Sequence, residues 1–320
     1  MKRSSAMVRF ARYVQALPLW VFRFLEWPVV VFLSRHKNVP QALFVLALPR
    51  SGSTLTYQML CHGLSVQYLS NIWNLTYQLP LFGGLLSRAF TRQHQSDFKS
   101  AHGFVPAIGG PAEGLRFWDW WLGTGLIDNA CERISTKKQT RRTEYLLQVL
   151  SVLTYRGRPF VTAYLGHTLV PDKVNKAFPG AVLIRLRRDP VSNALSLLNS
   201  MRENDAKWVS VIPHECFGLQ DKSDHERVAA QVYWLNRKLV DADCFDAMLT
   251  VDYEDLCERP TETLAGIKSW CDQKGLSIEP KFSLPKAFDY KLADLELDLD
   301  AIKIGRALDQ LETTHGKLDS

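Results

Sequence analysis

Residues Ala42-Leu-Phe-Val-Leu-Ala-Leu-Pro-Arg-Ser-Gly-Ser-Thr54 run from an uninterrupted apolar segment into a short polar loop, and a helical pattern follows directly. A strand, a tight loop and a helix N-terminus together form a phosphate site, because the loop N–H groups and the positive end of the helix dipole converge on the anion. Gly52 lets the backbone approach a ligand closely. Arg50 adds a fixed positive charge. Three residues add hydroxyl donors: Ser51, Ser53 and Thr54.

This loop differs from a nucleoside-triphosphate loop, which consists of Gly, four residues, and then Gly-Lys-Ser/Thr. Ala47 stands where the first Gly belongs, and Ser53 stands where the Lys belongs. Pro49-Arg-Ser-Gly-Ser-Thr54 instead resembles the 5′-phosphosulfate loop of the sulfotransferases, which use 3′-phosphoadenosine 5′-phosphosulfate as donor. The resemblance implies that five residues bind the phosphosulfate: Arg50, Ser51, Gly52, Ser53 and Thr54.

A second apolar segment, Ala181-Val-Leu-Ile-Arg-Leu-Arg-Arg188, ends in basic residues. Asp189 is a favourable N-cap and Pro190 is favoured at the first helical position, so a helix is predicted to begin here. Arg188 at the strand end and Ser196 on the second helical turn would then bind one anion from two sides. In the sulfotransferase family, an Arg and a Ser eight residues later bind the 3′-phosphate of the donor, and the resemblance gives this role to Arg188 and Ser196.

A third segment, Leu249-Thr-Val-Asp-Tyr-Glu-Asp-Leu256, resembles the family's strand that ends in Tyr-Glu-Asp-Leu, and it places Tyr253 near the nucleotide. The resemblance covers residues 41–275 and is closer to the carbohydrate, tyrosyl-protein and bacterial branches than to the cytosolic small-molecule branch. The cytosolic branch also holds the 3′-phosphate with a C-terminal Arg-Lys-Gly element, which this sequence lacks. Lys303 and Arg306 are the candidate substitutes.

Expected strands alternate with expected helices along the chain, which indicates an α/β fold with a parallel sheet flanked by helices. Ligands of such sheets bind at the carboxyl ends of the strands, where Arg50 and Arg188 both fall. Residues 39–320 are then one sulfotransferase domain that follows a basic and apolar extension over residues 1–38.

The connecting segments are predicted from their composition. Residues 67–111 are expected to be rich in loops, with Gly83-Gly84 as a break, and residues 204–226 are expected to form a mobile loop over the site. Lys137, Lys138, Arg141 and Arg142 are expected in a solvated turn. Further helices are expected over residues 53–61, 143–155, 171–178 and 261–270.

Sulfuryl transfer is an in-line displacement in which the acceptor hydroxyl must lose a proton, so a Glu or His is required as a base. Glu113 is the preferred base, because branches of the family that use Glu place it in this part of the chain; the alternative is a helix N-terminal Glu favoured by the dipole. His167 is the second candidate, although the Lys that precedes the family's His base has no match here. His102 is the third candidate. Arg50 and the loop amides would stabilise the leaving group.

Phe117-Trp-Asp-Trp-Trp121 is the densest aromatic cluster. Aromatic rings stack on sugar faces, which would fit a glycan acceptor. The helical spacing of Phe117, Trp120 and Trp121 instead favours the buried face of a helix. We expect the acceptor to be a hydroxyl group of a carbohydrate or a glycolipid.

The chain of 320 residues is 46% hydrophobic and 22% charged, which indicates a globular protein with a full core. A net charge of +6 without a dense basic stripe does not favour a nucleic-acid partner. The six cysteines are scattered and lack metal-ligand spacing, so we expect buried thiols in a reducing compartment and no metal site. These features favour the cytoplasm, with attachment to a membrane surface as an alternative.

Residues 1–12 are basic, and residues 14–33 are apolar and aromatic. Arg23, Glu26 and two prolines interrupt the apolar run and argue against a spanning helix. The run also lacks a small-residue cleavage site, which argues against a signal peptide. Two interpretations of residues 1–38 stay open: a helix on a membrane surface, or a segment packed on the domain, which the aromatic stripe favours.

Two other functions stay open as well. A nucleotide kinase or hydrolase would need Mg²⁺, a loop Lys and a metal-binding Asp after a strand, whereas sulfuryl transfer requires no metal because the transferred group carries less charge than a phosphoryl group. A non-catalytic membrane-surface protein on the same fold would bind donor or lipid without turnover.

Overall fold

The computed structural model describes residues 19–34, 40–92, 94–100, 103–126, 137–154, 158–294 and 297–318. One five-stranded sheet lies at its centre, with the strands in the order β2-β3-β1-β4-β5 and all neighbours parallel. The strands are Ala42–Ala47 (β1), Gln67–Tyr68 (β2), Phe160–Thr162 (β3), Val182–Arg187 (β4) and Met248–Asp252 (β5). The α/β fold expected from the sequence is confirmed.

The central strand β1 is the apolar segment that precedes the Pro49–Thr54 loop, and all six of its residues are buried. A strand covered on both faces needs such a continuous apolar run, since neither face meets water. In the register of the sheet, Ala47 of β1 pairs with Leu186 of β4, and Arg187 of β4 pairs with Asp252 of β5. Three strands therefore end at one level, which brings the loops that follow them together.

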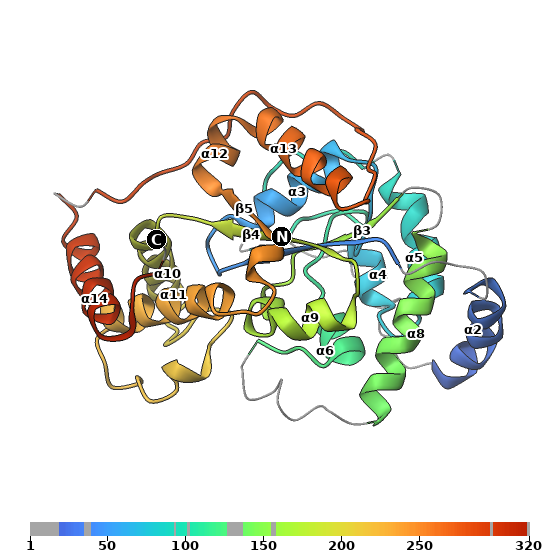
Figure 1. Cartoon of the computed structure of the whole chain (residues 1–320), viewed down its shortest axis with the longest axis horizontal. Coiled ribbons are helices and arrows are strands. Elements are labelled where there is room, and N and C mark those ends of the chain that lie inside the picture. The colour runs from blue at the N-terminus through green and yellow to red at the C-terminus, as the bar shows by residue number, and fades with distance from the viewer. Residues whose placement is uncertain are drawn as a thin grey trace.

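Helices cover both faces of the sheet (Figure 1). On one face lie α3 (Ser53–Gly63), α12 (Tyr253–Glu258) and α13 (Pro260–Gln273), and on the other lie α6 (Leu115–Leu122) and α9 (Pro171–Ala177). At one end of the molecule α10 (Pro190–Glu203), α11 (Asp224–Val240) and α14 (Leu299–His315) pack together. At the opposite end lie α2 (Leu19–Ser34), α5 (Pro80–Thr91) and α8 (Lys137–Leu153), and α4 (Asn71–Leu75) lies beside α5.

The helix after β4 begins as its sequence predicts. Pro190 is the first helical residue, and the side chain of Asp189 accepts a hydrogen bond from the Ser192 N–H at 2.7 Å. This cap satisfies one of the N–H groups that a helix leaves without a partner at its start. It also fixes the direction in which α10 leaves the sheet, and thereby the place of Ser196.

Residues 67–111 contain more helix than the sequence suggested, and the break expected at Gly83-Gly84 is wrong. Both glycines lie inside α5 and are buried. A Cβ at Gly83 would come within 2.6 Å of the Trp73 ring, and one at Gly84 within 2.3 Å of Leu153. These glycines allow α5 to pack closely on α4 and α8, so close packing outweighs their low helix propensity.

The solvated turn expected around Lys137 and Arg142 is also wrong, because these residues form the first turns of α8. The guanidinium of Arg142 lies 3.8 Å from the centre of the Trp120 ring. In the aromatic cluster on α6, Phe117, Trp118 and Trp121 are fully buried. The interpretation as a buried helix face is therefore confirmed, with Trp118 in the place expected for Trp120.

Helix α2 packs on α8 and α5. None of the described helices has the length and apolar character needed to cross a membrane. Residues 1–18 and 35–39, which complete the sequence around this helix, lie outside the described residues.

Candidate active site

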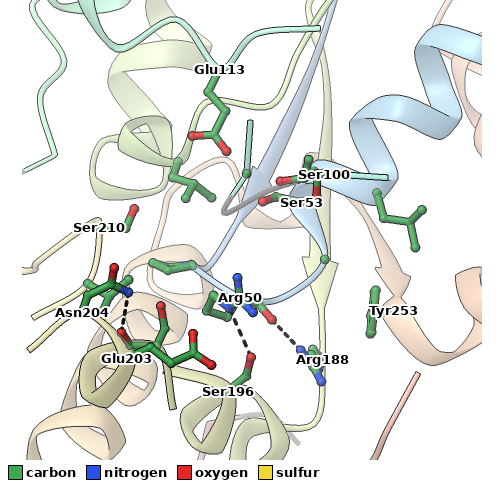
Figure 2. Close-up of a pocket in the computed structure, with 18 residues that line it drawn as sticks. Arg50, Ser53, Ser100, Glu113, Arg188, Ser196, Glu203, Asn204, Ser210 and Tyr253 are labelled. Carbon is green, nitrogen blue, oxygen red and sulfur yellow. Dashed lines mark hydrogen bonds between the residues drawn. The ribbon is translucent and has the colours of Figure 1, made fainter. Parts of the chain in front are cut away.

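A pocket of about 620 Å³ lies at the carboxyl ends of β1 and β4, on the switch point of the sheet where the chain connections run to opposite sides. Its walls come from the loop after β1, the start of α3, the region around Glu113, the end of β4, α10 and the segment after it (Figure 2). It is lined by Pro49, Arg50, Gly52, Ser53, Thr54, Leu55, Ser100, Gly103, Glu113, Leu165, Arg188, Ser196, Ser200, Glu203, Asn204, Val209, Ser210 and Tyr253.

The loop after β1 makes a tight turn that turns its backbone toward the pocket. Arg50 and Gly52 both have positive φ, at 63° and 94°. Gly52 is also the point where Tyr253 approaches, because a Cβ there would lie 2.2 Å from the ring. Only glycine fits this position, for conformational and for steric reasons.

Helix α3 begins at this loop without a capping side chain. The N–H groups of Gly52, Ser53 and Thr54 donate to no other group within the part of the chain that the structure describes. Unsatisfied N–H groups at a helix start carry partial positive charge and attract anions. The geometry of this loop therefore agrees with the anion-binding loop that the sequence predicts.

Ser51 differs from the other hydroxyl residues of the loop. It is buried, and its hydroxyl donates a hydrogen bond of 2.7 Å to the carbonyl oxygen of Leu48. It is not among the residues that line the pocket, whereas Ser53 and Thr54 are. The expectation that the Ser51 hydroxyl binds a ligand is thus not met, because this hydroxyl holds the turn closed.

The loop is connected to the second half of the pocket by direct hydrogen bonds (Figure 2). Arg188 Nη1 donates to the carbonyl oxygen of Arg50 at 2.5 Å, and Arg50 Nε donates to the Ser196 hydroxyl at 3.2 Å. Asn193 of α10 donates to the carbonyl oxygen of Pro49 at 2.7 Å. The structure therefore brings Arg50, Arg188 and Ser196 together, although the first lies far from the other two in sequence.

Arg188 is the only one of the three arginines near the end of β4 that lines the pocket. Arg185 is buried on one face of the strand, with its guanidinium over Phe245. Arg187 pairs with Asp252 of β5, with an N–O distance of 2.6 Å. Arg185 and Arg187 are two residues apart in β4 and therefore share a face of the strand, which separates both of them from Arg188.

Tyr253 lines the pocket at the start of α12, directly after β5. The guanidinium carbon of Arg188 lies 4.9 Å from the centre of its ring, which is within the range of a cation–π contact. Arg188 Nε is buried and has no hydrogen-bond partner among the described residues. One donor of this arginine is therefore left for a ligand.

Glu113 points into the pocket toward the loop that carries Arg50 and Ser53 (Figure 2). Its carboxylate lies beside Gly103, where an added Cβ would be 3.4 Å from Oε1. Burial raises the pKa of Glu113 to about 7. A carboxyl group with such a pKa exchanges its proton near neutral pH, which suits a general base.

His167 lies in the core and not in the pocket, so its candidacy as a base is not supported. It follows β3 in a short 3₁₀ helix (Leu165–Leu169), fully buried, and its ring contacts Phe44, Trp118 and Tyr164. Burial in this aromatic environment lowers its pKa to about 3, which makes the imidazole a poor proton acceptor at neutral pH. His102, the third candidate, lies outside the described residues.

Sequence reasoning missed Glu203, which lines the pocket from the last turn of α10. Asn204 and Ser210 also line the pocket, and both belong to the segment 204–226 that was expected to cover the site. Only the length of α10 could have indicated Glu203. Lys303 and Arg306, the suggested substitutes for the missing Arg-Lys-Gly element, are exposed on α14 and do not line the pocket.

A model of the sulfotransferase family matches residues 40–276 of this sequence. The chain belongs to the sulfotransferase family. The match begins just before β1 and ends just after α13, so it includes the whole sheet and the pocket loops. The protein is therefore a sulfotransferase enzyme, and members of this family generally use 3′-phosphoadenosine 5′-phosphosulfate.

The sulfotransferase is also similar in structure to solved bacterial members. Sulfotransferase STF1 from Mycobacterium tuberculosis is 15% identical, with a TM-score of 0.51 over 97% of this chain and 85% of that one. Sulfotransferase STF9 from Mycobacterium avium is 16% identical, with a TM-score of 0.49 over 95% of this chain and 74% of that one. At 15% identity, the similarity to STF1 supports the α/β fold of this chain and no more specific property. A comparison with curated protein sequences gives no match.

No group of three or more His, Cys, Asp or Glu side chains in the described part of this sulfotransferase is arranged to hold a metal ion. The described cysteines are buried free thiols: Cys61, Cys216, Cys244, Cys257 and Cys271.

Proposed function

We propose that this sulfotransferase transfers a sulfuryl group from 3′-phosphoadenosine 5′-phosphosulfate to a hydroxyl group of a carbohydrate or a glycolipid. The observation that carries the proposal is one pocket that joins the Arg50 loop to Arg188 and Ser196 and places Glu113 opposite them. In this assignment the product that remains in the pocket is 3′,5′-bisphosphoadenosine.

The residues present suit a donor with two anionic ends. Gly52, Ser53 and Thr54 offer backbone N–H groups at the start of α3, and Arg50 adds a guanidinium for the 5′ end. Arg188 and Ser196 offer donors for the 3′-phosphate, and the buried Arg188 Nε still lacks a partner within the described chain. Charge-assisted hydrogen bonds of this kind to phosphate oxygens are among the strongest polar contacts in proteins.

Each residue then has a distinct part in the chemistry. The bound donor supplies an activated sulfuryl group. Arg50 and the N–H groups of the loop would stabilise the negative charge that develops on the departing 5′-phosphate. Glu113 Oε would accept the proton of the acceptor hydroxyl, and burial of this carboxylate makes it a stronger base than an exposed one.

Polar groups of the pocket wall support a polyhydroxylated acceptor. Ser100, Glu203, Asn204 and Ser210 bring hydroxyl, carboxylate and amide groups to the pocket. Such groups form hydrogen bonds with sugar hydroxyls. Stacking by the aromatic cluster on α6 does not support this assignment, because Phe117, Trp118 and Trp121 are fully buried.

The proposal is tested by calorimetric titration with 3′,5′-bisphosphoadenosine in EDTA, in parallel with ATP plus Mg²⁺. We expect the bisphosphate to bind without metal and more tightly than ATP. Binding of only ATP with Mg²⁺ would contradict the proposal in favour of a nucleotide kinase or hydrolase. Donor binding without turnover on any of a set of sugar and glycolipid acceptors would instead favour the non-catalytic alternative.

Replacing Arg188 by Ala should weaken the binding of 3′,5′-bisphosphoadenosine by about 10- to 100-fold, because one or two charge-assisted hydrogen bonds are lost. Arg187→Ala is the matched control. Arg187 is the neighbour of Arg188 and carries the same charge, but its side chain lies outside the pocket and pairs with Asp252. Titration of both variants measures the difference. Equal affinities for the two variants would show that Arg188 does not contact the nucleotide.

A further inference from the structure

Helix α2 carries an exposed apolar face that the active site does not use. Phe24, Leu25 and Phe32 are 75%, 64% and 70% exposed, and Trp27 is 56% exposed. Aromatic and aliphatic side chains of this size rarely gather on a surface that meets only water. Phe82 of α5 is also exposed, and its backbone N–H contacts α2 at Glu26.

The helix is fixed to the body of the protein by its opposite side. Glu26 is buried and accepts a hydrogen bond of 2.7 Å from the Phe82 N–H and one of 3.0 Å from the Tyr145 hydroxyl. Val30, one turn further, is fully buried. Residues 24 and 32 therefore point outward because residues 26 and 30 are held inward, so the apolar face is a fixed feature of the surface.

A basic region lies directly beside the apolar face, at the junction of α2 and α8. One cavity of about 450 Å³ is lined by Arg23, Lys137, Arg141 and Arg142. A neighbouring cavity of about 520 Å³ is lined by Arg23, Phe24, Trp27, Arg141 and Tyr145. The second cavity combines aromatic and cationic walls, which suits a ligand with a negative head and an apolar tail.

Two of these cations, Arg23 and Arg142, lie against aromatic rings. Arg23 lies 5.2 Å from the centre of the Trp121 ring, and Arg142 lies over Trp120. Neither Arg23 nor Arg141 nor Lys137 forms an ion pair within the described ranges. The pKa of Arg142 is lowered by burial and by the nearby Arg23, so an anion that entered here would relieve the repulsion between the two charges.

We propose that α2, with the neighbouring ends of α5 and α8, docks this sulfotransferase on an anionic lipid surface. The apolar side chains enter the boundary between headgroups and acyl chains, and the cations of the basic region bind lipid phosphates. Aromatic residues and arginines favour this boundary, and juxtaposed apolar and basic surfaces are typical of proteins that lie on a membrane without spanning it. This attachment does not depend on the identity of the donor or the acceptor.

Vesicle flotation of the full chain tests the proposal. Vesicles of phosphatidylcholine with about one-third phosphatidylserine should bind the protein, and pure phosphatidylcholine should bind it at least about tenfold more weakly. Raising the salt concentration should release the protein from the anionic vesicles, since the attraction between exposed charges is screened. Failure to bind anionic vesicles at low salt overturns the proposal.

Two variants with matched controls separate the apolar and the charged contributions. Phe24→Ser with Phe32→Ser, and Lys137→Gln with Arg141→Gln, should each reduce binding to the anionic vesicles by roughly tenfold or more. The apolar control is Leu297→Ser with Leu299→Ser, two residues that are 83% and 71% exposed elsewhere on the surface. The charge control is Lys303→Gln with Arg306→Gln on α14, and both controls should bind as the unchanged protein does.

Light scattering without vesicles distinguishes the membrane from a second copy of the chain. The docking proposal expects the unchanged protein and the Phe24/Phe32 variant to have the same mass in solution. A dimer that depends on Phe24 and Phe32, together with equal vesicle binding by all variants, would show that this face joins two copies and would overturn the proposal.

Discussion

Glu113→Gln is expected to reduce turnover by about 10²- to 10⁴-fold, the range that a positioned general base contributes. The glutamine keeps the size of the side chain but cannot accept the proton of the acceptor hydroxyl. The affinity for 3′,5′-bisphosphoadenosine should change little, because Arg188 and Ser196 are untouched. Turnover with a sugar acceptor and titration with the bisphosphate measure the two effects separately.

The pH dependence gives a second measurement of the same residue. Since burial raises the pKa of Glu113 to about 7, the proton-accepting form increases as the pH rises through 7. Turnover should therefore rise through this range in the unchanged protein and lose that dependence in Glu113→Gln. Asp119→Asn, which removes an exposed carboxylate from α6 outside the pocket, is the control and should retain both turnover and pH profile. A Glu113→Gln variant that keeps its turnover would contradict the assignment.

The pH dependence of the protein's stability gives an independent test of the raised pKa of Glu113. A pKa raised from its ordinary 4.5 means that the folded state holds the proton more tightly than the unfolded state does. The contribution of Glu113 to stability is therefore complete below pH 4.5 and is lost as the pH rises through about 7. Glu113→Gln should gain thermal stability relative to the unchanged protein over this interval.

Arg50→Ala is expected to reduce turnover by about 10²- to 10³-fold, comparable to the removal of one strong donor from a site where negative charge develops. The variant loses the guanidinium next to the 5′ end of the donor and the hydrogen bond to Ser196. Because the substitution removes contacts to the transition state, the loss of turnover should exceed the loss of donor affinity. Single-turnover kinetics and titration measure the two losses.

Arg50→Lys is the matched comparison for this prediction. It keeps the positive charge but not the planar fork of donors, so an intermediate turnover is expected. Thermal unfolding of both variants checks that the loop still folds, since Arg50 occupies the left-handed region with φ at 63°. Turnover of Arg50→Ala within threefold of the unchanged protein, with normal unfolding, would rule out a role for Arg50 in catalysis.

The parts of the fold that could be predicted from the sequence are those fixed by local chemistry. The apolar run of β1 and the cap formed by Asp189 and Pro190 each act within a few residues, and the structure agrees with both. The resemblance then placed Arg50, Arg188 and Ser196 in one site, and the register between β1 and β4 brings them together.

The parts that could not be predicted depend on contacts between distant segments. Gly83 and Gly84 resemble a helix break until the surrounding Trp73 and Leu153 are known. His167 resembles a candidate base in sequence, and only the rings packed around it show that it belongs to the core. Ser51 resembles a ligand donor, but its hydroxyl has a nearer acceptor in the Leu48 carbonyl.

The aromatic surroundings of His167 have a consequence for the tolerance of the protein to acid. An imidazole released into water binds a proton below its ordinary pKa of 6.5, whereas the buried ring resists protonation down to about 3. The contribution of His167 to stability therefore falls by about 1.4 kcal/mol for each pH unit between that ordinary value and about 3. The side chain that completes the packing around Phe44 and Trp118 thus favours the folded chain more at neutral than at acidic pH, in the opposite sense to the buried carboxyl group of Glu113.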